Sequence, residues 1–461
     1  MREEFCQQLQ IGTNYDMIEK IFYCGGKKCW LYYMDGFSDV GIQERVLQYL
    51  SGITDKQIQA VQSMEQFGEQ LVPYGECFVF YKIEDAVKML FSGPFALFVD
   101  GINGVLMVDM RQYPTRGISE PENDRVLRGP RDGFCEVLNF NTGMIRRRIR
   151  DTDLRFEIVS CQCLGKSDIV VGYMEGRADK ALVEKIKQDI QNIHTDTCMI
   201  NQESLVEILQ PKKMLSPFPK VRSTERPDVA AHSLAEGRVV VLIDNSPSCL
   251  IFPTYLPDFC EQASDFYFSP AVGTYLRWIR ILTTFITIFV TPFWLWLSHT
   301  AMALPDWLTF VRVTDTAALP LVAQLLLLEL AIDGLRMASI NTPDPMAASV
   351  SIVGGLILGD FAVQSGVIVS QAIFYMSFVS IATFTQPSVE LGYAIKFCRI
   401  GLTILSWLFG IWGIVAGTAT LFIILRSMRA YDGKNYLYPF IPFQKQQVQT
   451  LLFRRDAKSK K

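Results

Sequence analysis

Three ionisable residues interrupt a stretch of otherwise apolar sequence. The segment LLLLELAIDGLRMASI, residues 325–340, contains Glu329, Asp333 and Arg336 among leucine, isoleucine and alanine. An α-helix turns by about 100° per residue, so Asp333 lies about 40° from Glu329, and Arg336 about 20° from it on the other side. The three side chains therefore share one narrow face of the predicted helix.

Charge is costly in an apolar helix, so this face needs a polar environment. A partner helix, a water-filled cavity or an ion path would each provide one. We predict that Glu329, Asp333 and Arg336 line such a polar interior. The alternative is that Arg336 pairs internally with Glu329 or Asp333, which would make the group purely architectural.

The rest of the chain shows no arrangement of residues for catalysis. The G-x-S-x-G, Walker-type, Rossmann and H-E-x-x-H motifs are all absent from the sequence. The histidines at 194, 232 and 299 do not have zinc-ligand spacing from the close cysteine pairs. No basic domain indicates nucleic-acid binding. We therefore expect a protein that is not an enzyme, has no cofactor or metal site and binds no nucleic acid.

Hydrophobic residues are spread unevenly over the chain. Residues 1–278 are rich in charge, whereas residues 279–425 consist mainly of Leu, Ile, Phe, Val and Ala, and the mean hydropathy of the whole chain is +0.20. This division predicts an α/β cytosolic region of two repeated subdomains followed by an α-helical multi-pass membrane domain. The predicted parts are a first subdomain (1–127), a basic helical linker with a second subdomain (128–275), a membrane domain (276–430) and a basic cytosolic tail (431–461).

Two pairs of similar segments predict that the soluble region is duplicated. YMDGFSDVGIQERVLQYL, from Tyr33, resembles YMEGRADKALVEKIKQDI, from Tyr173, and each joins the end of a strand to an amphipathic helix. SGPFALFVDGINGVLMVD, from Ser92, resembles EGRVVVLIDNSPSCLIFP, from Glu236, and each has the pattern of a β-hairpin. Because the order and spacing are nearly kept, we predict two α/β subdomains, at roughly 20–115 and 160–265, each with a strand, a helix and a hairpin.

Arginine is concentrated in the predicted linker between the subdomains. The densest positive cluster in the chain consists of Arg146, Arg147, Arg148, Arg150 and Arg155, and the first four form a candidate docking patch. A solvated helix end would explain it. So would docking to an acidic face of a neighbouring subunit or to anionic lipid, where each basic residue contributes about 1 kcal/mol.

Four apolar stretches are candidates for membrane segments. Residues 279–301 and 401–425 each predict one spanning helix, and residues 320–337 can cross once. Residues 346–384 are too long for one span and are interrupted by Asp360, which predicts a hairpin or a re-entrant segment. We predict four crossings with this piece partly re-entrant, and six crossings is the alternative. Glycines four residues apart, which allow close helix packing, are Gly355 with Gly359 and Gly413 with Gly417.

Basic residues indicate that both termini are cytoplasmic. Arg277 and Arg280 precede the first predicted span, and Arg426, Arg429 and the tail FRRDAKSKK follow the last one. By the positive-inside rule these ends lie in the cytoplasm, so the number of crossings is even. The N-terminal sequence MREEFCQQLQIGTNYD lacks the apolar core of a signal peptide, which predicts that the soluble part stays in the cytosol.

Several motifs resemble the A-subunit family of spore germination receptors. They are RGPRDGF, NFNTGMIRRRIRD, TERPDVAAHSLAEGRVVVLIDNSPS, SPAVGTYLRWIR, LPLVAQLLLLELAIDGLRMASINTP, IVGGLILGDFAVQSG and YPFIPF, and they cover nearly the full length. The resemblance implies a membrane protein of endospore-forming bacteria, located in the inner membrane of the dormant spore and active in germination. It also implies a ring oligomer, with a pentamer as the expected form, that conducts ions beside other germination proteins of that membrane.

Combined with the charged face, the resemblance predicts an ion channel. In a ring, each subunit would add two acids and one base from residues 329–336, and such a net negative belt favours monovalent cations. Glu329 and Asp333 would set the selectivity, and Asp360 is a further candidate for the ion path. Two alternatives are a membrane scaffold that clusters germination receptors without conducting, and a transporter, because broken helices with polar residues at mid-membrane are typical of transporters.

Overall fold

The structure is a computed structural model, and it divides the chain into two compact units, Met1–Gly117 and Ile118–Lys461. The division falls before the predicted boundary at residue 127, and Asp124 accepts hydrogen bonds from Thr224 and Glu225 of the second unit. The described residues are 1–9, 11, 17–34, 40–72, 75–111, 119–121, 124–160, 162–163, 167–195, 201–209, 216–300, 311–313, 317–341, 352, 354–355, 359 and 361–454.

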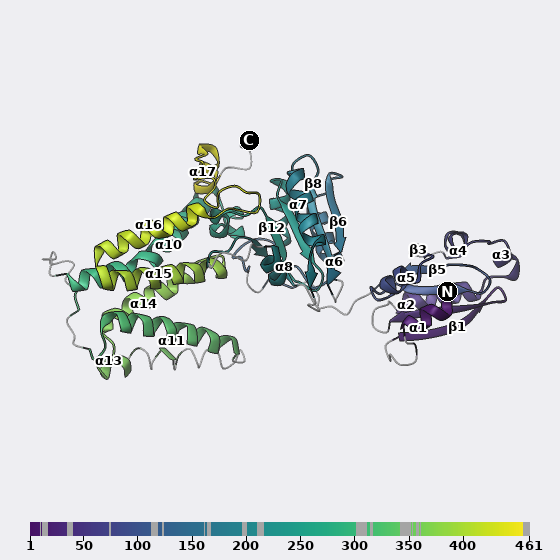
Figure 1. Ribbon diagram of the computed structural model, residues 1–461, viewed down its shortest axis with the longest axis horizontal. Coiled ribbons are helices and arrows are strands. Elements are labelled where there is room, and N and C mark those ends of the chain that lie inside the picture. The colour runs from purple at the N-terminus through teal and green to yellow at the C-terminus, as the bar shows by residue number, and fades with distance from the viewer. Residues whose placement is uncertain are drawn as a thin grey trace. The chain divides into compact units, whose positions relative to one another are not determined.

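The first unit is a five-stranded antiparallel sheet with helices on both faces (Figure 1). Its strand order is β1-β2-β4-β5-β3. Phe5 and Leu90 cover one face of the sheet, and Val46 and Phe67 cover the other. The elements are α1 (Arg2–Leu9), β1 (Met17–Cys24), β2 (Lys27–Met34), α2 (Val40–Ser51), α3 (Asp55–Gln59), α4 (Met64–Leu71), β3 (Glu76–Phe80), α5 (Ile83–Leu90), β4 (Phe95–Val99) and β5 (Val105–Asp109).

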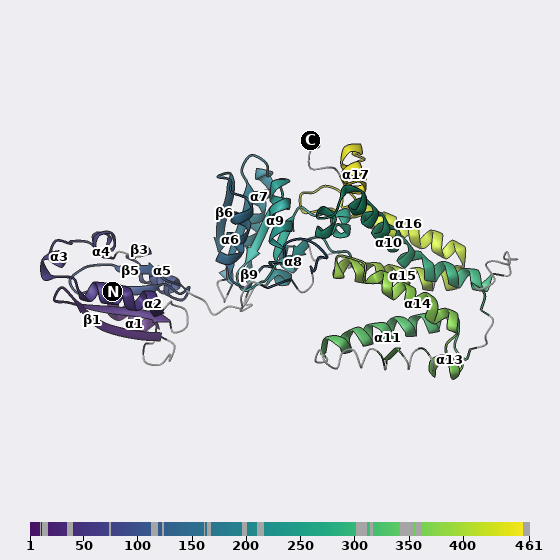
Figure 2. The ribbon, with the colours of Figure 1, turned by 180° about the vertical axis from the view of Figure 1, so that it is seen from behind.

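The second unit begins with another five-stranded antiparallel sheet, which we call subdomain 2 (Figure 2). Its strand order is β10-β12-β11-β8-β6, and a short parallel pair, β7 with β9, lies outside this sheet. The elements are α6 (Leu138–Arg148), β6 (Leu154–Ser160), β7 (Gln162–Cys163), β8 (Asp168–Met174), α7 (Lys180–Gln191), β9 (His194–Thr195), α8 (Gln202–Leu209), β10 (Arg222–Thr224), α9 (Pro227–Ala235), β11 (Val239–Ile243) and β12 (Cys249–Phe252).

The two sheets have the same topology, in agreement with the duplication that the paired motifs predict. Written from its other edge, the second sheet is β6-β8-β11-β12-β10, which matches the first strand for strand. Helices α1 and α5 pack on one face of the first sheet, and α6 and α9 pack on the matching face of the second. Both hairpin turns also need a residue at positive φ, which is Gly101 (78°) in one and Asn245 (62°) in the other.

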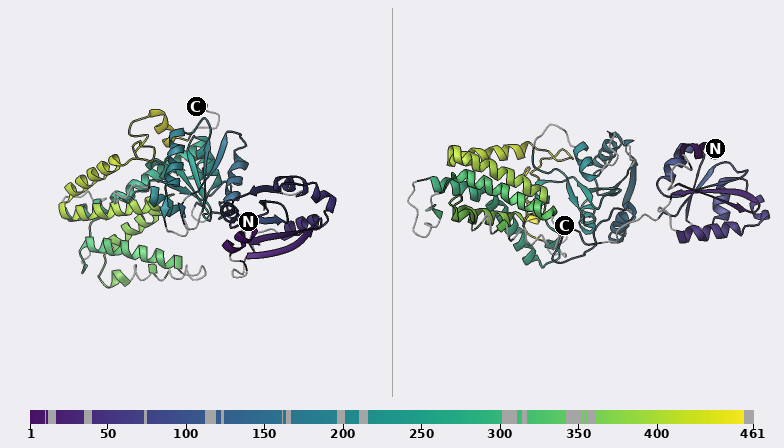
Figure 3. Two further views of the ribbon diagram at one scale, coloured as in Figure 1. Left: turned by 45° about the vertical axis from the view of Figure 1, so that its right-hand side comes forward. Right: turned by 90° about the horizontal axis from the view of Figure 1, so that it is seen from below.

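Helices that lie side by side make up the rest of the second unit (Figure 3). Two of the described helices, α10 and α15, have the length and hydropathy of a membrane span, and α16 is a shorter apolar helix. The multi-pass topology therefore stays a prediction. The elements are η1 (Leu256–Cys260), η2 (Ala263–Phe266), α10 (Pro270–His299), α11 (Leu321–Asn341), α13 (Ala362–Gln364), α14 (Ser370–Thr383), α15 (Val389–Phe409), α16 (Ile411–Ser427) and α17 (Lys445–Leu452).

The prediction of one spanning helix over residues 401–425 is wrong. The chain forms two helices there, α15 and α16, which meet at Gly410 with φ 60° and ψ −139°. Residues that carry a Cβ rarely adopt this backbone conformation, so a glycine is needed at the turn. Helix α16 folds back along α15 so closely that a Cβ at Gly417 would lie 2.6 Å from Leu402 Cδ2. Hydropathy does not reveal this turn, because the sequence is apolar on both sides of it.

The segment after α16 returns to subdomain 2 and completes its core. The ring of Tyr431 packs against Phe252, with the ring centroids 5.1 Å apart, and its hydroxyl donates to Asp189 of α7. Tyr436 is fully buried, and its hydroxyl donates to the carbonyl of Pro219. A separate apolar cluster joins η1 (Leu256–Cys260) to α15 and to the end of α16, through Phe259, Leu391, Ile395, Met428 and Tyr436.

Candidate functional site: a charge cluster between helices α11 and α15

Glu329 of α11 forms a bidentate ion pair with Arg399 of α15. Arg399 Nε donates to Glu329 Oε1 at 2.6 Å, and a terminal nitrogen donates to Oε2 at 2.9 Å. Both side chains are buried, with 8 % of Glu329 and 4 % of Arg399 exposed. A third guanidinium contact reaches the carbonyl of Thr287 in α10, at 3.5 Å. This pair therefore connects three helices that are far apart in the sequence.

A second ion pair, one helical turn away, links the same two helices. The ammonium group of Lys396 donates to Asp333 and, at 3.2 Å, to the backbone carbonyl of Glu329. It also lies 3.5 Å from Glu329 Oε2. A third of the Asp333 side chain is exposed, so this pair is wetter than the first. The positions 329 and 333 on α11 thus face 396 and 399 on α15.

The third predicted member of the face, Arg336, packs against aromatic rings. Its guanidinium carbon lies 5.5 Å from the ring centroid of Phe384 and 5.4 Å from that of Tyr393. A cavity of about 30 Å³ lies beside the cluster, and hydroxyls from α14, Ser380 and Thr383, contribute to its wall. One water molecule fits in such a space.

The sequence prediction missed Lys396 and Arg399. They lie three residues apart in YAIKFCRIGL, and this was the signal that could have found them. The predicted span started at residue 401 and so excluded them, whereas α15 starts at Val389. The predicted net negative belt needs correction for the same reason. In this chain Lys396 and Arg399 face the two acids, so together with Arg336 the cluster contains three cations and two acids and is not negative.

The predicted glycine pairs differ in their surroundings. A Cβ at Gly413 would overlap the carbonyl oxygen of Leu405, so α15 and α16 are in backbone contact there. At Gly355 and Gly359 a Cβ would meet no described heavy atom within 4 Å. Asp360 lies outside the described residues.

The four predicted docking arginines lie at the C-terminal end of α6 and just beyond it. Arg148 forms an ion pair with Asp132 at 2.6 Å, and Arg146 donates to two backbone carbonyls and lies over the ring of Phe156. Arg146, Arg147 and Arg150 are exposed. Helix α6 and strand β6 lie on the side of subdomain 2 away from α10–α16 (Figures 1 and 2). This placement favours docking to protein over docking to lipid.

Arg277 and Arg280 join α10 to the short 3-10 helices η1 and η2 that precede it. They lie inside α10 and are each 5 % exposed. Arg280 donates to both carboxylate oxygens of Asp265, at 2.9 and 3.0 Å, and to the carbonyl of Cys260. The predicted role of these arginines, as charges flanking a span, thus omits their salt bridges to η2.

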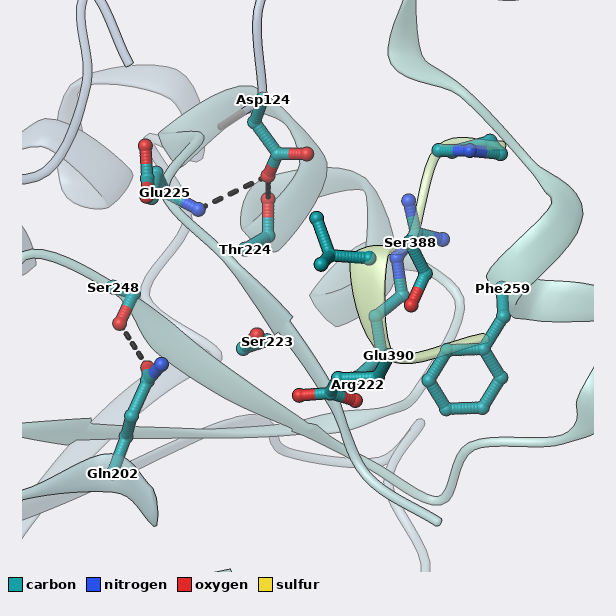
Figure 4. A pocket seen from close by; sticks show the side chains of 12 residues that line it. Asp124, Gln202, Arg222, Ser223, Thr224, Glu225, Ser248, Phe259, Ser388 and Glu390 are labelled. Atoms are coloured by element: carbon teal, nitrogen blue, oxygen red, sulfur yellow. Dashed lines mark hydrogen bonds between the residues drawn. The ribbon is translucent and has the colours of Figure 1, made fainter. Parts of the chain in front are cut away.

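A polar pocket lies where the edge strand β10 meets the first turn of α15 (Figure 4). Its volume is about 260 Å³. Asp124 Oδ2 accepts hydrogen bonds from Thr224 Oγ1, at 2.6 Å, and from the amide of Glu225, at 3.1 Å. Other lining residues are Gln202, Arg222, Ser248, Phe259, Ser388 and Glu390. Subdomain 2 and the first turn of α15 therefore lie next to each other at this pocket.

Comparison with known proteins identifies the family. The sequence profile described as Bacillus/Clostridium GerA spore germination protein matches residues 5–461. The chain belongs to the GerA family. This GerA protein is 32 % identical to stage V sporulation protein AF of Bacillus subtilis, over 98 % of its own length and 91 % of that protein. It is 29 % identical to spore germination protein KA of the same organism, over 96 % and 82 % of the two chains.

The motif LELAIDGLRMAS predicts a likeness of this GerA protein to stage V sporulation protein AF, and the match confirms it. A solved relative is the N-terminal domain of the A subunit of the Bacillus megaterium spore germinant receptor GerK3. It is 28 % identical, covers 54 % of this chain and 92 % of its own, and has a TM-score of 0.22.

Proposed function

We propose that this GerA-family chain is a subunit of a homo-oligomeric ion channel in the inner membrane of the spore, which conducts during germination. The buried ion pair Glu329–Arg399 is the observation that carries the proposal. Ionisable groups inside apolar helices are rare because they are costly, and they commonly mark ion paths. Membership of the GerA family supports the role in germination. It also supports the expectation that other germination proteins are partners of this chain.

The two ion pairs would hold the channel closed. Both join α11 to α15, so a small separation of these helices breaks both together. Water would then solvate the freed charges, which offsets much of the lost attraction, because desolvation nearly cancels the Coulomb energy of a buried pair. A helix pair of this kind has two states of similar free energy, as a gate requires.

Opening would also create the negative lining that the closed state lacks. With Lys396 and Arg399 withdrawn, Glu329 and Asp333 would face water on the α11 side of the path. Rings of carboxylates favour cations. We therefore propose monovalent cations as the conducted ions, with selectivity set only after the pairs separate.

A charge swap tests this function. The variant Glu329→Arg with Arg399→Glu keeps an ion pair between the same helices but places a cation on α11. Purified wild type and variant are reconstituted in liposomes, and the permeability ratio of potassium to chloride is measured. We expect the swap to lower this ratio at least several-fold while the oligomer, followed by size-exclusion chromatography, is unchanged.

The controls separate the competing functions. The swap Lys180→Glu with Glu175→Lys, an exposed 2.8 Å pair at the start of α7 in subdomain 2, should leave the ratio as in wild type, because neither residue belongs to the helices α10–α16. An unchanged ratio in the 329/399 swap would show that the face is architectural. Absence of flux in every protein, including wild type with its germination partners, would support the scaffold.

We further propose that both termini are cytoplasmic. A cysteine placed at the C-terminus should then be protected from an impermeant thiol reagent in sealed membranes. Ready labelling would contradict an even number of crossings.

A further inference from the structure

The C-terminal helix α17 lies against the start of α10. A terminal nitrogen of Arg277 donates to the carbonyls of Thr450 and Leu451, both at 3.0 Å, and so caps the C-terminal end of α17. The amide of Arg454 donates to Thr274 Oγ1 at 3.2 Å, and the rings of Phe453 and Trp278 are 6.2 Å apart. These contacts attach the end of the chain to its first apolar helix.

The docked arrangement leaves hydrogen bonds unmade. Arg277 Nε is buried and has no hydrogen-bond partner, although Asp265 Oδ2 is only 3.6 Å away. A terminal nitrogen of Arg454 is also buried without a partner. Among the described residues four buried side-chain atoms are in this state, and two of them lie at this one contact. A buried donor without an acceptor is unfavourable, so the docked contact is imperfect.

Arg280 shows what Arg277 lacks. Both arginines lie on α10 and face Asp265, but Arg280 donates to both carboxylate oxygens. Arg277 instead directs a terminal nitrogen to α17, and its nearest approach to Asp265 is longer than a hydrogen bond. The carbonyls of α17 and the carboxylate of Asp265 thus compete for one guanidinium.

Helix α17 is held by few apolar contacts. Only Val448 of its eight residues is buried, and its sequence, KQQVQTLL, is mostly polar and exposed. Segments with so little buried apolar surface open locally at low cost.

We propose that α17 is a releasable strap on the joint between η2 and α10. When docked, it draws Arg277 away from Asp265, and when released, it lets Arg277 complete the ion pair with Asp265. Arg277 and Thr287 lie on the same helix, α10. A change in the partner of Arg277 would therefore shift α10 and alter the contact between the Thr287 carbonyl and Arg399. The competition itself stands without the channel, and only its effect on ion flow rests on the proposed function.

Two matched substitutions in the full-length protein test the strap. Val448→Asp removes the buried anchor of α17, and Gln447→Asp places the same charge on its exposed face. Hydrogen exchange in detergent should show faster exchange over residues 445–453 in the first variant only. The decisive measurement is the loss of thermal stability caused by Arg277→Met in each background.

The sign of that effect decides the proposal. If Asp265 gains Arg277 after release, Arg277→Met lowers Tm more in the Val448→Asp protein than in wild type or in the Gln447→Asp control. If Arg277 only anchors α17, the same substitution lowers Tm less in the Val448→Asp protein, because two of its acceptors have already gone. Equal losses would also overturn the competition. Ion flux is measured in parallel, so a strap effect on stability without any flux contradicts the channel and not the strap.

Discussion

Substitution of the buried ion pair gives the sharpest test of the charge cluster. Glu329→Gln leaves Arg399 with a positive charge at 4 % exposure, no countercharge, and one amide oxygen in place of the two carboxylate oxygens that now accept at 2.6 and 2.9 Å. Removal of one member of a buried pair commonly costs about 3–5 kcal/mol, because the other charge stays desolvated. We expect Glu329→Gln to lower the free energy of unfolding by about this amount.

The double substitution should cost less than either single one. Glu329→Gln with Arg399→Met keeps the side-chain volumes similar and removes both charges. Replacing a whole buried pair with well-packed uncharged residues of similar volume is often neutral or stabilising by about 1–4 kcal/mol. A protein less damaged by two substitutions than by one would show that the pair forms and that its charges compensate each other.

Asp333→Asn supplies the comparison within the same site. A third of this side chain is exposed, so water screens its pair with Lys396, and we expect a loss of about 1 kcal/mol or less. Unfolding of the wild type and of the four variants, with the single substitution Arg399→Met among them, is followed in detergent by circular dichroism against temperature or denaturant. Equal and additive losses at 329, 333 and 399 would refute the reasoning, because they would show that burial does not set the energies.

Two further predictions concern packing and pH. Gly413→Ala should lower Tm markedly, because the new Cβ would overlap the carbonyl oxygen of Leu405. The control Gly401→Ala should leave Tm nearly unchanged, because a Cβ there meets nothing within 4 Å. Similar Tm values for the two variants would contradict the close α15–α16 contact. The hydrogen bond to Glu236 raises the pKa of His232, so its contribution to stability is present below about pH 6.5 and is lost as pH rises through the raised value. Glu236→Gln should flatten this part of the Tm–pH curve between about pH 5.5 and 8.5, and an unchanged curve would count against the bond.

The duplicated fold could be predicted because its signals are local. Each hairpin combines two short apolar runs with a turn that needs positive φ, and such patterns can be recognised within about 20 residues. Neither edge strand of either copy was predicted: these are β1 and β3 in the first sheet and β6 and β10 in the second. Strand β10 is only three residues long, Arg222–Thr224, and three residues show no periodicity.

The sequence predicted the two acids of the charge cluster, Glu329 and Asp333, but not the two basic residues that pair with them, and the reason is physical. A hydropathy scan favours spans that begin after the last charge, so it placed Lys396 and Arg399 outside the helix to which they belong. Their charges are compatible with α15 because Asp333 and Glu329 face them across 63 and 70 residues of sequence. Pairing over such distances has no local signal.

The Gly410 turn and the η2 joint were missed in similar ways. Glycine is common in apolar helices, so Gly410 alone did not indicate that the chain reverses there. Arg277 and Arg280 agree with the positive-inside rule, which accounts for their charge without an internal partner. Their carboxylate, Asp265, lies only 15 residues before Arg280 but belongs to a short 3-10 element with no clear pattern.

The core of subdomain 2 has a consequence for the order of folding. Tyr431, which packs against Phe252, follows α10–α16 in the sequence, so it leaves the ribosome only after all of these helices. Domains generally fold as units during synthesis, but this one lacks part of its core until the helices behind it have been made. A nascent chain whose helices are misplaced cannot bring Tyr431 back to the sheet. The stability of subdomain 2 therefore depends on correct assembly of the helices. Proteases or chaperones that recognise an unstable subdomain 2 would also act on chains whose helices are misassembled.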